Sequence, residues 1–330
     1  MFLSFIMLRE EIVEFLGEDW TALNGQIRGA LKSDVHLLQA VNDDIISHSG
    51  KMLRPLMALL VARIVGGKAN GDAVKVAAAT ELLHNATLLH DDVADKSTLR
   101  RGKPTLCSKI GPQAAVLVGD FWLARAMELV VEVKDHQEAI VDVFSNAMTC
   151  LAEGEMLQLE KASGERTERK DYLRIIYCKT ASLFETACLS AAIASGADEG
   201  QLAQVKKYAY SLGIAFQIKD DILDYVGDAA LGKPVGIDLK EQKITLPLLC
   251  ALEGSPREDE IRKMLFDIHN HPEYCEQIRT FVFEHQGVEK AEVILERYIQ
   301  DAVDALNCFG DGREKEYLTG IARYNTVRKS

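Results

Sequence analysis

The sequence predicts an all-α protein that folds as one large helical domain. Among its 330 residues only 7 are proline and 23 glycine, so helix breakers are few. The apolar fraction of 48% is sufficient for a large core. Apolar residues recur at intervals of three and four along the whole chain, and no useful length of strand alternation interrupts them.

Three segments show the helical pattern most clearly, residues 55–66, 71–95 and 112–133. Residues 74–79 are apolar nearly all round, which predicts a helix in the centre of a bundle. Glycine and proline separate the segments, and no low-complexity linker divides the chain. The best candidate boundary is residues 250–260, so we expect a core of about residues 45–250 and peripheral helices over 251–330, within a single domain spanning 1–330.

The net charge of the chain and the spacing of its cysteines indicate which binding partners and which cellular compartment to expect. A net charge of −12 argues against nucleic acid as a partner. The 7 cysteines have no CxxC spacing, so we expect reduced thiols in a cytoplasmic protein. No run reaches the roughly 18 apolar residues of a membrane-spanning helix. The opening "MFLSFIML" lacks a basic region and makes a poor signal peptide, and the sequence does not decide between a start at Met1 and one at Met7.

Two aspartate clusters follow apolar helical segments and share one spacing, i, i+1 and i+4. They are Asp91, Asp92 and Asp95, and Asp220, Asp221 and Asp224. On a helix the first and third carboxylates lie about 40° apart around the axis, one turn from each other, and their repulsion calls for a cation. Carboxylates of this kind suit Mg²⁺ shared with substrate phosphates, and the ligand patterns of zinc and of calcium loops are absent. A solvated acidic face is the alternative, and two matched clusters disfavour it.

Basic residues near these clusters are candidates for binding phosphate. They are Lys51 and Arg54, Arg100 and Arg101, Lys179 beside Thr180, and Lys219 and Lys233. Arginine makes fork-like contacts with phosphate oxygens, and lysine supplies a point charge. Each of them taken alone is most simply a surface charge, although the apolar neighbours of Lys179 predict burial. His84 lies about 20° from Asp91 around the same helix, so a contact with substrate is geometrically feasible.

These motifs together resemble the trans-isoprenyl diphosphate synthase family, also called polyprenyl synthetases, over about residues 45–250. The matching segments are "SGKMLRP", "HNATLLHDDVADKSTLRRG" with its DDxxD motif, "KTASLF", "GIAFQIKDDILD" and "GKPVGIDLKEQKITLP". The departures are small, since Ser49 replaces a glycine and Met52 a basic residue of the opening motif. The resemblance implies the isoprenoid synthase fold, an all-α bundle with a central cavity at whose mouth the two clusters face each other.

The resemblance also implies a role for each matching residue. The six aspartates would hold about three Mg²⁺ ions on an allylic diphosphate such as farnesyl diphosphate. Arg100, Lys179, Gln217 and Lys233 would contact that diphosphate, Lys51, Arg54, His84 and Arg101 would hold isopentenyl diphosphate, and Thr180 and Gln217 would line the reacting centre. The family implies a prenyltransferase that acts as a homodimer, and its hydrophobic product implies transient contact with a membrane.

The length of the product should depend on the helix that precedes Asp91. The positions that the resemblance assigns to chain length are Ala86, Thr87, Leu82 and Leu83, with Val118, Trp122 and Met127 as candidates for the tunnel floor. Ala86 and Thr87 are small where family members with short products carry bulky aromatics. We therefore expect a long-chain product, of about thirty carbons or more and of the kind used for quinone side chains.

Three alternatives remain open at this point. A short- or medium-chain synthase, making farnesyl or geranylgeranyl diphosphate, would differ only in the tunnel floor. A class I terpene cyclase shares the first cluster, but its second motif is of the Asn/Asp-Ser/Thr-Glu type, where this chain has "DDILD". A non-catalytic partner subunit tends to lose acidic motifs, and this chain keeps all six aspartates of the two clusters.

Overall fold

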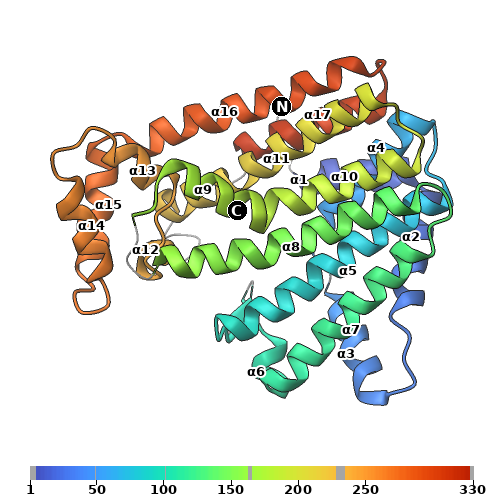
Figure 1. The fold of residues 1–330 in the computed structure, drawn as a ribbon, viewed down its shortest axis with the longest axis horizontal. Coiled ribbons are helices and arrows are strands. Elements are labelled where there is room, and N and C mark those ends of the chain that lie inside the picture. Colours follow the sequence, from blue (N-terminus) through green and yellow to red (C-terminus); the bar gives the residue numbers. More distant parts are fainter. Residues whose placement is uncertain (1–4, 49, 101, 163–165, 228–234, 328–330) are drawn as a thin grey trace. The chain divides into compact units, whose positions relative to one another are not determined.

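The fold is helical, as the computed structural model of the chain shows for residues 5–48, 50–100, 102–162, 166–227 and 235–327 (Figure 1). The strands within this part are β1 (Leu99–Arg100) and β2 (Lys103–Pro104), which form one short antiparallel pair. The all-α prediction is therefore confirmed. None of the helices in the described ranges has both the length and the apolar character that crossing a bilayer requires.

The chain divides into two compact units, each assembled from separate stretches of sequence. Unit 1 comprises Met1–Ser145, Thr186–Val205 and Cys308–Leu318, and unit 2 comprises Asn146–Glu185, Lys206–Asn307 and Thr319–Ser330. Four α-helices have residues in both units, α8 (Gln137–Ala162), α10 (Ser182–Ala194), α11 (Glu199–Val226) and α17 (Arg313–Val327), as does the 3-10 turn η3 (Leu306–Cys308). The division does not fall at residues 250–260, and a single domain stays a prediction.

The centre of unit 1 is built from its most apolar helices. Its complete helices are α1 (Phe5–Leu16), α2 (Glu18–Ala30), α3 (His36–Ser47), α4 (Leu53–Gly66), α5 (Gly71–Ala94), α6 (Leu106–Ile110) and α7 (Pro112–Val131). The helices expected at residues 55–66, 71–95 and 112–133 are thus confirmed as α4, α5 and α7. Residues 55–62 of α4 are buried, and so are residues 74–79 of α5 apart from the half-buried Lys75, as their nearly uniform apolar sequence predicts. Helices α5 and α7 run side by side (Figure 1).

A buried pair of hydrogen bonds ties three helices of unit 1 together. Trp122 Nε1 of α7 donates to Asn42 Oδ1 of α3 at 2.8 Å. Asn42 Nδ2 in turn donates to the Leu31 carbonyl at the end of α2, also at 2.8 Å. Both side chains are buried, so their polar atoms need these partners.

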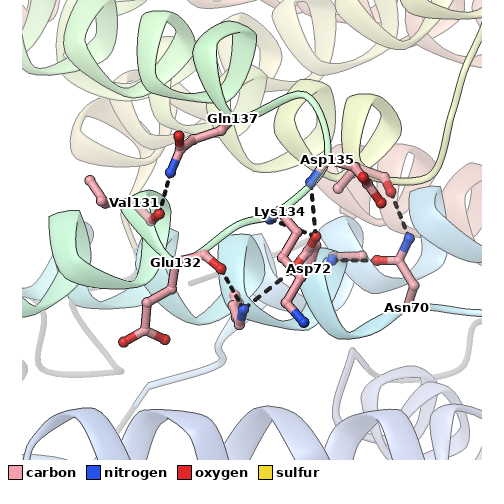
Figure 2. Close-up of polar contacts among 10 residues, drawn as sticks. Asn70, Asp72, Val131, Glu132, Lys134, Asp135 and Gln137 are labelled. Atoms are coloured by element: carbon pink, nitrogen blue, oxygen red, sulfur yellow. Dashed lines mark hydrogen bonds and ion pairs between the residues drawn. The ribbon is translucent and has the colours of Figure 1, made fainter.

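The start of α5 holds the connection between α7 and α8 (Figure 2). Asn70 caps α5 by accepting from the Ala73 amide at 2.7 Å. The Asp72 carboxylate accepts from the backbone amides of Lys134 at 3.0 Å and Asp135 at 3.4 Å, and Gln137 Nε2 donates to the Val131 carbonyl. Hydrogen bonds from side chains therefore hold this connection against the start of α5 and join its two ends.

Unit 2 contains a second apolar core. Its remaining helices are α9 (Arg169–Ile176), the π-helix η1 (Tyr177–Ala181), α12 (Ile237–Lys240), α13 (Leu246–Leu252), α14 (Glu258–Phe266), α15 (Tyr274–Glu284) and α16 (Gly287–Ala305). Residues of α9, α11, α13, α15 and α16 fill the core, among them Tyr172, Ile218 and Phe281. A capping box at Glu168 and Asp171 starts α9 and so places Tyr172 in its first turn.

Candidate active site

The first aspartate cluster lies at the C-terminal end of α5. Asp91 and Asp92 are in its last turn, and Asp95 is the residue that caps it. Helix C-termini carry partial negative charge, so carboxylates here are unfavourable without a cation nearby. Asp92 is only 5% exposed, and Arg100 Nε donates to its Oδ1 at 2.8 Å, whereas Asp95 is exposed.

The short β-hairpin returns Arg100 to Asp92. Arg100 pairs with Lys103 in the hairpin, and Thr105 Oγ1 closes the loop by donating to the Ser97 carbonyl at 2.7 Å. The Arg100 side chain is still 37% exposed, which leaves part of the guanidinium accessible for an anion. Arg101 lies outside the described residues.

Three further candidates belong to the same unit. Lys51 is exposed just before α4, and Arg9 Nε donates to its carbonyl at 3.0 Å. Arg54 is half-buried in the first turn of α4. His84 is half-buried in α5, a helix that packs against α4.

The proposed chain-length residues occupy the turns of α5 before Asp91. Leu82, Leu83 and Ala86 are each at most 1% exposed, and Thr87 is half-buried. The Thr87 hydroxyl donates to the His84 carbonyl at 2.8 Å, so its hydrogen-bond donor is satisfied within the helix. Their part in a tunnel stays a prediction.

The second aspartate cluster lies in the last two turns of α11. Asp221 is 3% exposed, and both of its oxygens accept hydrogen bonds. Gln217 Nε2 donates to Oδ1 at 2.9 Å, and the Tyr172 hydroxyl donates to Oδ2 at 2.7 Å. Asp224 accepts from the amides of Ile237 and Asp238, each at 3.1 Å, and so holds the start of α12.

Burial makes it costly to ionise the carboxylates of this cluster. It raises the pKa of Asp221 well above its usual range, and the nearby Asp238 carboxylate raises it further, against the hydrogen bonds from Tyr172 and Gln217. Burial likewise raises the pKa of Asp224, and that of Asp238 to about 6. A bound cation would relieve this cost.

The donor set fits a hard cation such as Mg²⁺. Carboxylate oxygens dominate both clusters. Within the described ranges no three His, Cys, Asp or Glu side chains come close enough to hold a metal ion by themselves. Mg²⁺ needs no such cage when one or two carboxylates share it with phosphate oxygens.

Lys179 and Thr180 lie on the π-helix, where the sequence indicated an uninterrupted helix. Such turns often accompany functional sites because they re-aim side chains. Lys179 Nζ binds two residues of α8, Glu155 Oε1 at 2.7 Å and Gln158 Oε1 at 2.9 Å. The Thr180 hydroxyl donates to Gln217 Oε1 at 2.8 Å, which joins the π-helix to the second cluster.

Two glycines allow helices to approach the π-helix closely. A Cβ at Gly213 of α11 would lie 2.5 Å from Ala181 Cα, and one at Gly154 of α8 would lie 2.5 Å from Cys178 Cβ. Either contact would force the neighbouring atoms to move apart. The missing side chains therefore bring Lys179 and Thr180 within reach of α8 and α11.

The sequence interpretation missed several residues of this site. Tyr172 stands seven positions before Lys179 in "YLRIIYCK", and Glu155 and Gln158 stand three apart in "EMLQ". Asp238 was inside a quoted motif without a role. Lys219 is buried in α11, and Lys233 lies outside the described residues.

Comparisons with known proteins identify relatives over nearly the whole chain. Residues 35–282 match the family model described as Polyprenyl synthetase. The chain is 40% identical over 321 residues to the octaprenyl diphosphate synthase of Escherichia coli, covering 97% of this chain and 98% of that protein. It is similar to a decaprenyl diphosphate synthase structure from Rhodobacter capsulatus, with a TM-score of 0.90, 34% identity, and 98% and 99% of the two chains covered. A polyprenyl synthase from Caulobacter crescentus, complexed with calcium and isoprenyl diphosphate, gives a TM-score of 0.87 and 35% identity over 98% of both chains.

Proposed function

The chain belongs to the polyprenyl synthetase family, and from that premise we propose how its own residues make a long-chain all-trans-polyprenyl diphosphate. The enzyme is a prenyltransferase. In our proposal it condenses an allylic diphosphate such as farnesyl diphosphate with successive molecules of isopentenyl diphosphate. The long product agrees with the octaprenyl and decaprenyl synthases to which the chain is similar.

The observation that carries the proposal is the line of hydrogen bonds from Thr180 through Gln217 to Asp221. It connects a hydroxyl on the π-helix with an aspartate cluster suited to a diphosphate-bound cation. Lys179 is adjacent to Thr180 on the same turn. A reaction that separates diphosphate from an allylic carbon needs two kinds of group close together. Positive charge stabilises the leaving diphosphate, and an oxygen atom stabilises the positive carbon that remains.

Magnesium, when bound, would neutralise charge that develops on the departing diphosphate. The residues that would hold about three ions with substrate are the aspartates of both clusters, as carboxylates commonly do for phosphate substrates. A calcium ion accompanies isoprenyl diphosphate in the Caulobacter crescentus relative, which supports a divalent-cation site of this kind.

The basic side chains bind and orient the two substrates. Arg100, Lys179 and Lys233 would contact the allylic diphosphate with Gln217, and Lys51, Arg54, His84 and Arg101 would hold isopentenyl diphosphate. Lys179 is held by Glu155 at 2.7 Å, so diphosphate must compete with that carboxylate for its charge.

The proposed reaction needs no side chain to act as a general base, because the departed diphosphate accepts the proton that is lost. The allylic carbon–oxygen bond breaks, and the electron pair leaves with the diphosphate. The double bond of isopentenyl diphosphate then attacks the allylic carbon, and the proton that is lost goes to the departed diphosphate. Thr180 and Gln217 would line the reacting centre, where apolar surroundings exclude water that would quench the cation.

We propose a homodimer, for which α7 offers the surface. Leu117 is 61% exposed and Val131 57% exposed, and Ala124 lies exposed between them at seven-residue spacing. Apolar residues at this spacing favour packing against another helix. Light scattering of a Leu117→Glu variant tests this, because a dimer built on α7 should dissociate and one built elsewhere should not. The hydrophobic product makes transient contact with a membrane part of the proposal.

Product analysis is the direct test of function. Purified protein is incubated with farnesyl diphosphate, labelled isopentenyl diphosphate and Mg²⁺, and the product is measured by mass spectrometry. We expect a long polyprenyl diphosphate, and extension that stops at geranylgeranyl diphosphate would reject the long-chain assignment. Asp220→Asn should lower turnover by about 100-fold or more, whereas Asp259→Asn, at an exposed aspartate of α14, should leave it unchanged.

A further inference from the structure

Tyr172 makes a contact that the reaction scheme above leaves unexplained. It lies in α9, is 3% exposed, and its hydroxyl is 2.7 Å from Asp221 Oδ2, although 49 residues separate the two in sequence. Its own backbone is anchored in the first turn of α9, since its amide donates to the Glu168 carbonyl at 3.0 Å. At this distance the phenol hydroxyl is the donor and the carboxylate oxygen the acceptor.

The hydrogen bonds beyond Asp221 have a fixed direction. Asp221 accepts at both oxygens, so Gln217 must turn its amide nitrogen toward Asp221 and its amide oxygen away. That oxygen accepts the proton of Thr180. The Thr180 hydroxyl therefore uses its donor on Gln217, and its lone pairs are left for another partner.

We propose that Tyr172 is a positioning residue, which holds Asp221 so that the line Asp221–Gln217–Thr180 presents the lone pairs of the Thr180 oxygen to the allylic cation. This inference rests on the proposed function. Without the Tyr172 hydroxyl, Asp221 loses one of its two holding contacts and is free to rotate. The Gln217 amide is then no longer held in one orientation. Thr180 can turn its proton toward the cation, and a positive hydrogen facing a positive carbon is unfavourable.

Tyr172→Phe isolates this role because it removes one oxygen and keeps the ring that packs in the core. Tyr298→Phe is the matched control, since Tyr298 is a half-buried tyrosine of α16 that packs against Tyr210. We expect Tyr172→Phe to lower kcat by about 10- to 100-fold with the KM for isopentenyl diphosphate unchanged. Tyr298→Phe should change neither quantity.

A double-mutant cycle distinguishes positioning from a structural role. If Tyr172 acts through Thr180, adding Tyr172→Phe to Thr180→Val should change kcat, measured at saturating Mg²⁺, by less than about twofold. In a Thr180→Ser background, which keeps the hydroxyl, Tyr172→Phe should cost its full factor. The proposal would be overturned if the losses of kcat caused by Tyr172→Phe and by Thr180→Val multiplied in the double variant.

A binding measurement provides a readout that does not depend on turnover. Calorimetry with Mg²⁺ and inorganic pyrophosphate should show about tenfold weaker binding to Tyr172→Phe than to Tyr298→Phe. Equal binding by the two variants, or failure of Tyr172→Phe to fold as judged by circular dichroism, would overturn the proposal. A wild-type protein that makes no polyprenyl diphosphate would instead reject the proposed function, so the two failures are distinguishable.

Discussion

Gly213→Ala should separate the stability of α11 from the geometry of the site. Gly213 lies inside α11, where an alanine gains about 1 kcal/mol of helix propensity over glycine. The added Cβ, however, would lie 2.5 Å from Ala181 Cα and 2.7 Å from Ala181 Cβ. Carbon atoms in contact are about 3.5 Å apart or more, so the π-helix and α11 must separate by about 1 Å.

This displacement affects stability and catalysis differently. Overpacking of this kind costs about 1–3 kcal/mol, which is offset in part by the gain in propensity, so we expect a net loss of about 1 kcal/mol. The same shift lengthens the 2.8 Å bond between Thr180 Oγ1 and Gln217 Oε1. A misplacement of about 1 Å at a reacting centre lowers the rate by about 100-fold, so the effect on kcat should be the larger one.

Denaturant unfolding and steady-state kinetics on the same preparation measure both effects. Gly25→Ala is the control, because it lies in α2 with nothing within 4 Å of an added Cβ. It should stabilise the protein by up to about 1 kcal/mol and leave kcat unchanged. A Gly213→Ala protein that is as stable as Gly25→Ala and retains the kcat of the wild type would contradict this expectation.

Three other substitutions test separate parts of the site. Arg100→Met leaves the buried Asp92 without its guanidinium and should lower the free energy of unfolding by about 1 kcal/mol, a value that allows for the partial exposure of the arginine. Lys109→Met, at an exposed ion pair, is the control and should cost nothing measurable. Equal unfolding midpoints for the two variants would contradict this. The pKa of Asp238 is raised from 3.8 to about 6, so the folded state binds more protons and, without Mg²⁺, stability should fall as pH rises from about 4 to 6. Asp238→Asn should make this pH dependence shallower, with the remainder due to the raised pKa values of Asp221 and Asp224, and should be the more stable protein at pH 7. An unaltered profile would disprove the assignment. Ala86→Phe should shorten the product seen by mass spectrometry, and an unchanged product would remove Ala86 from the tunnel wall.

Local patterns in the sequence predicted the helices and the composition of the site. The buried faces of α4, α5 and α7 follow from apolar spacing, because helix period and burial depend on neighbouring residues. The spacing of Asp220, Asp221 and Asp224 likewise placed their carboxylates within about one helical turn of each other. The π-helix was not foreseen, since "YCKTA" has the composition of ordinary helix and only its packing distinguishes it.

By itself, then, the sequence determined the helical fold and the chemical groups that the site contains. Only the tertiary structure decided which partner each group has. Asp221 is held by Tyr172 from another helix, and Lys179 is held by Glu155 from a third, contacts that no local spacing encodes. The contact of Lys179 forms where Gly154 lets α8 approach the π-helix, and such close approach is a property of packed surfaces rather than of any one segment.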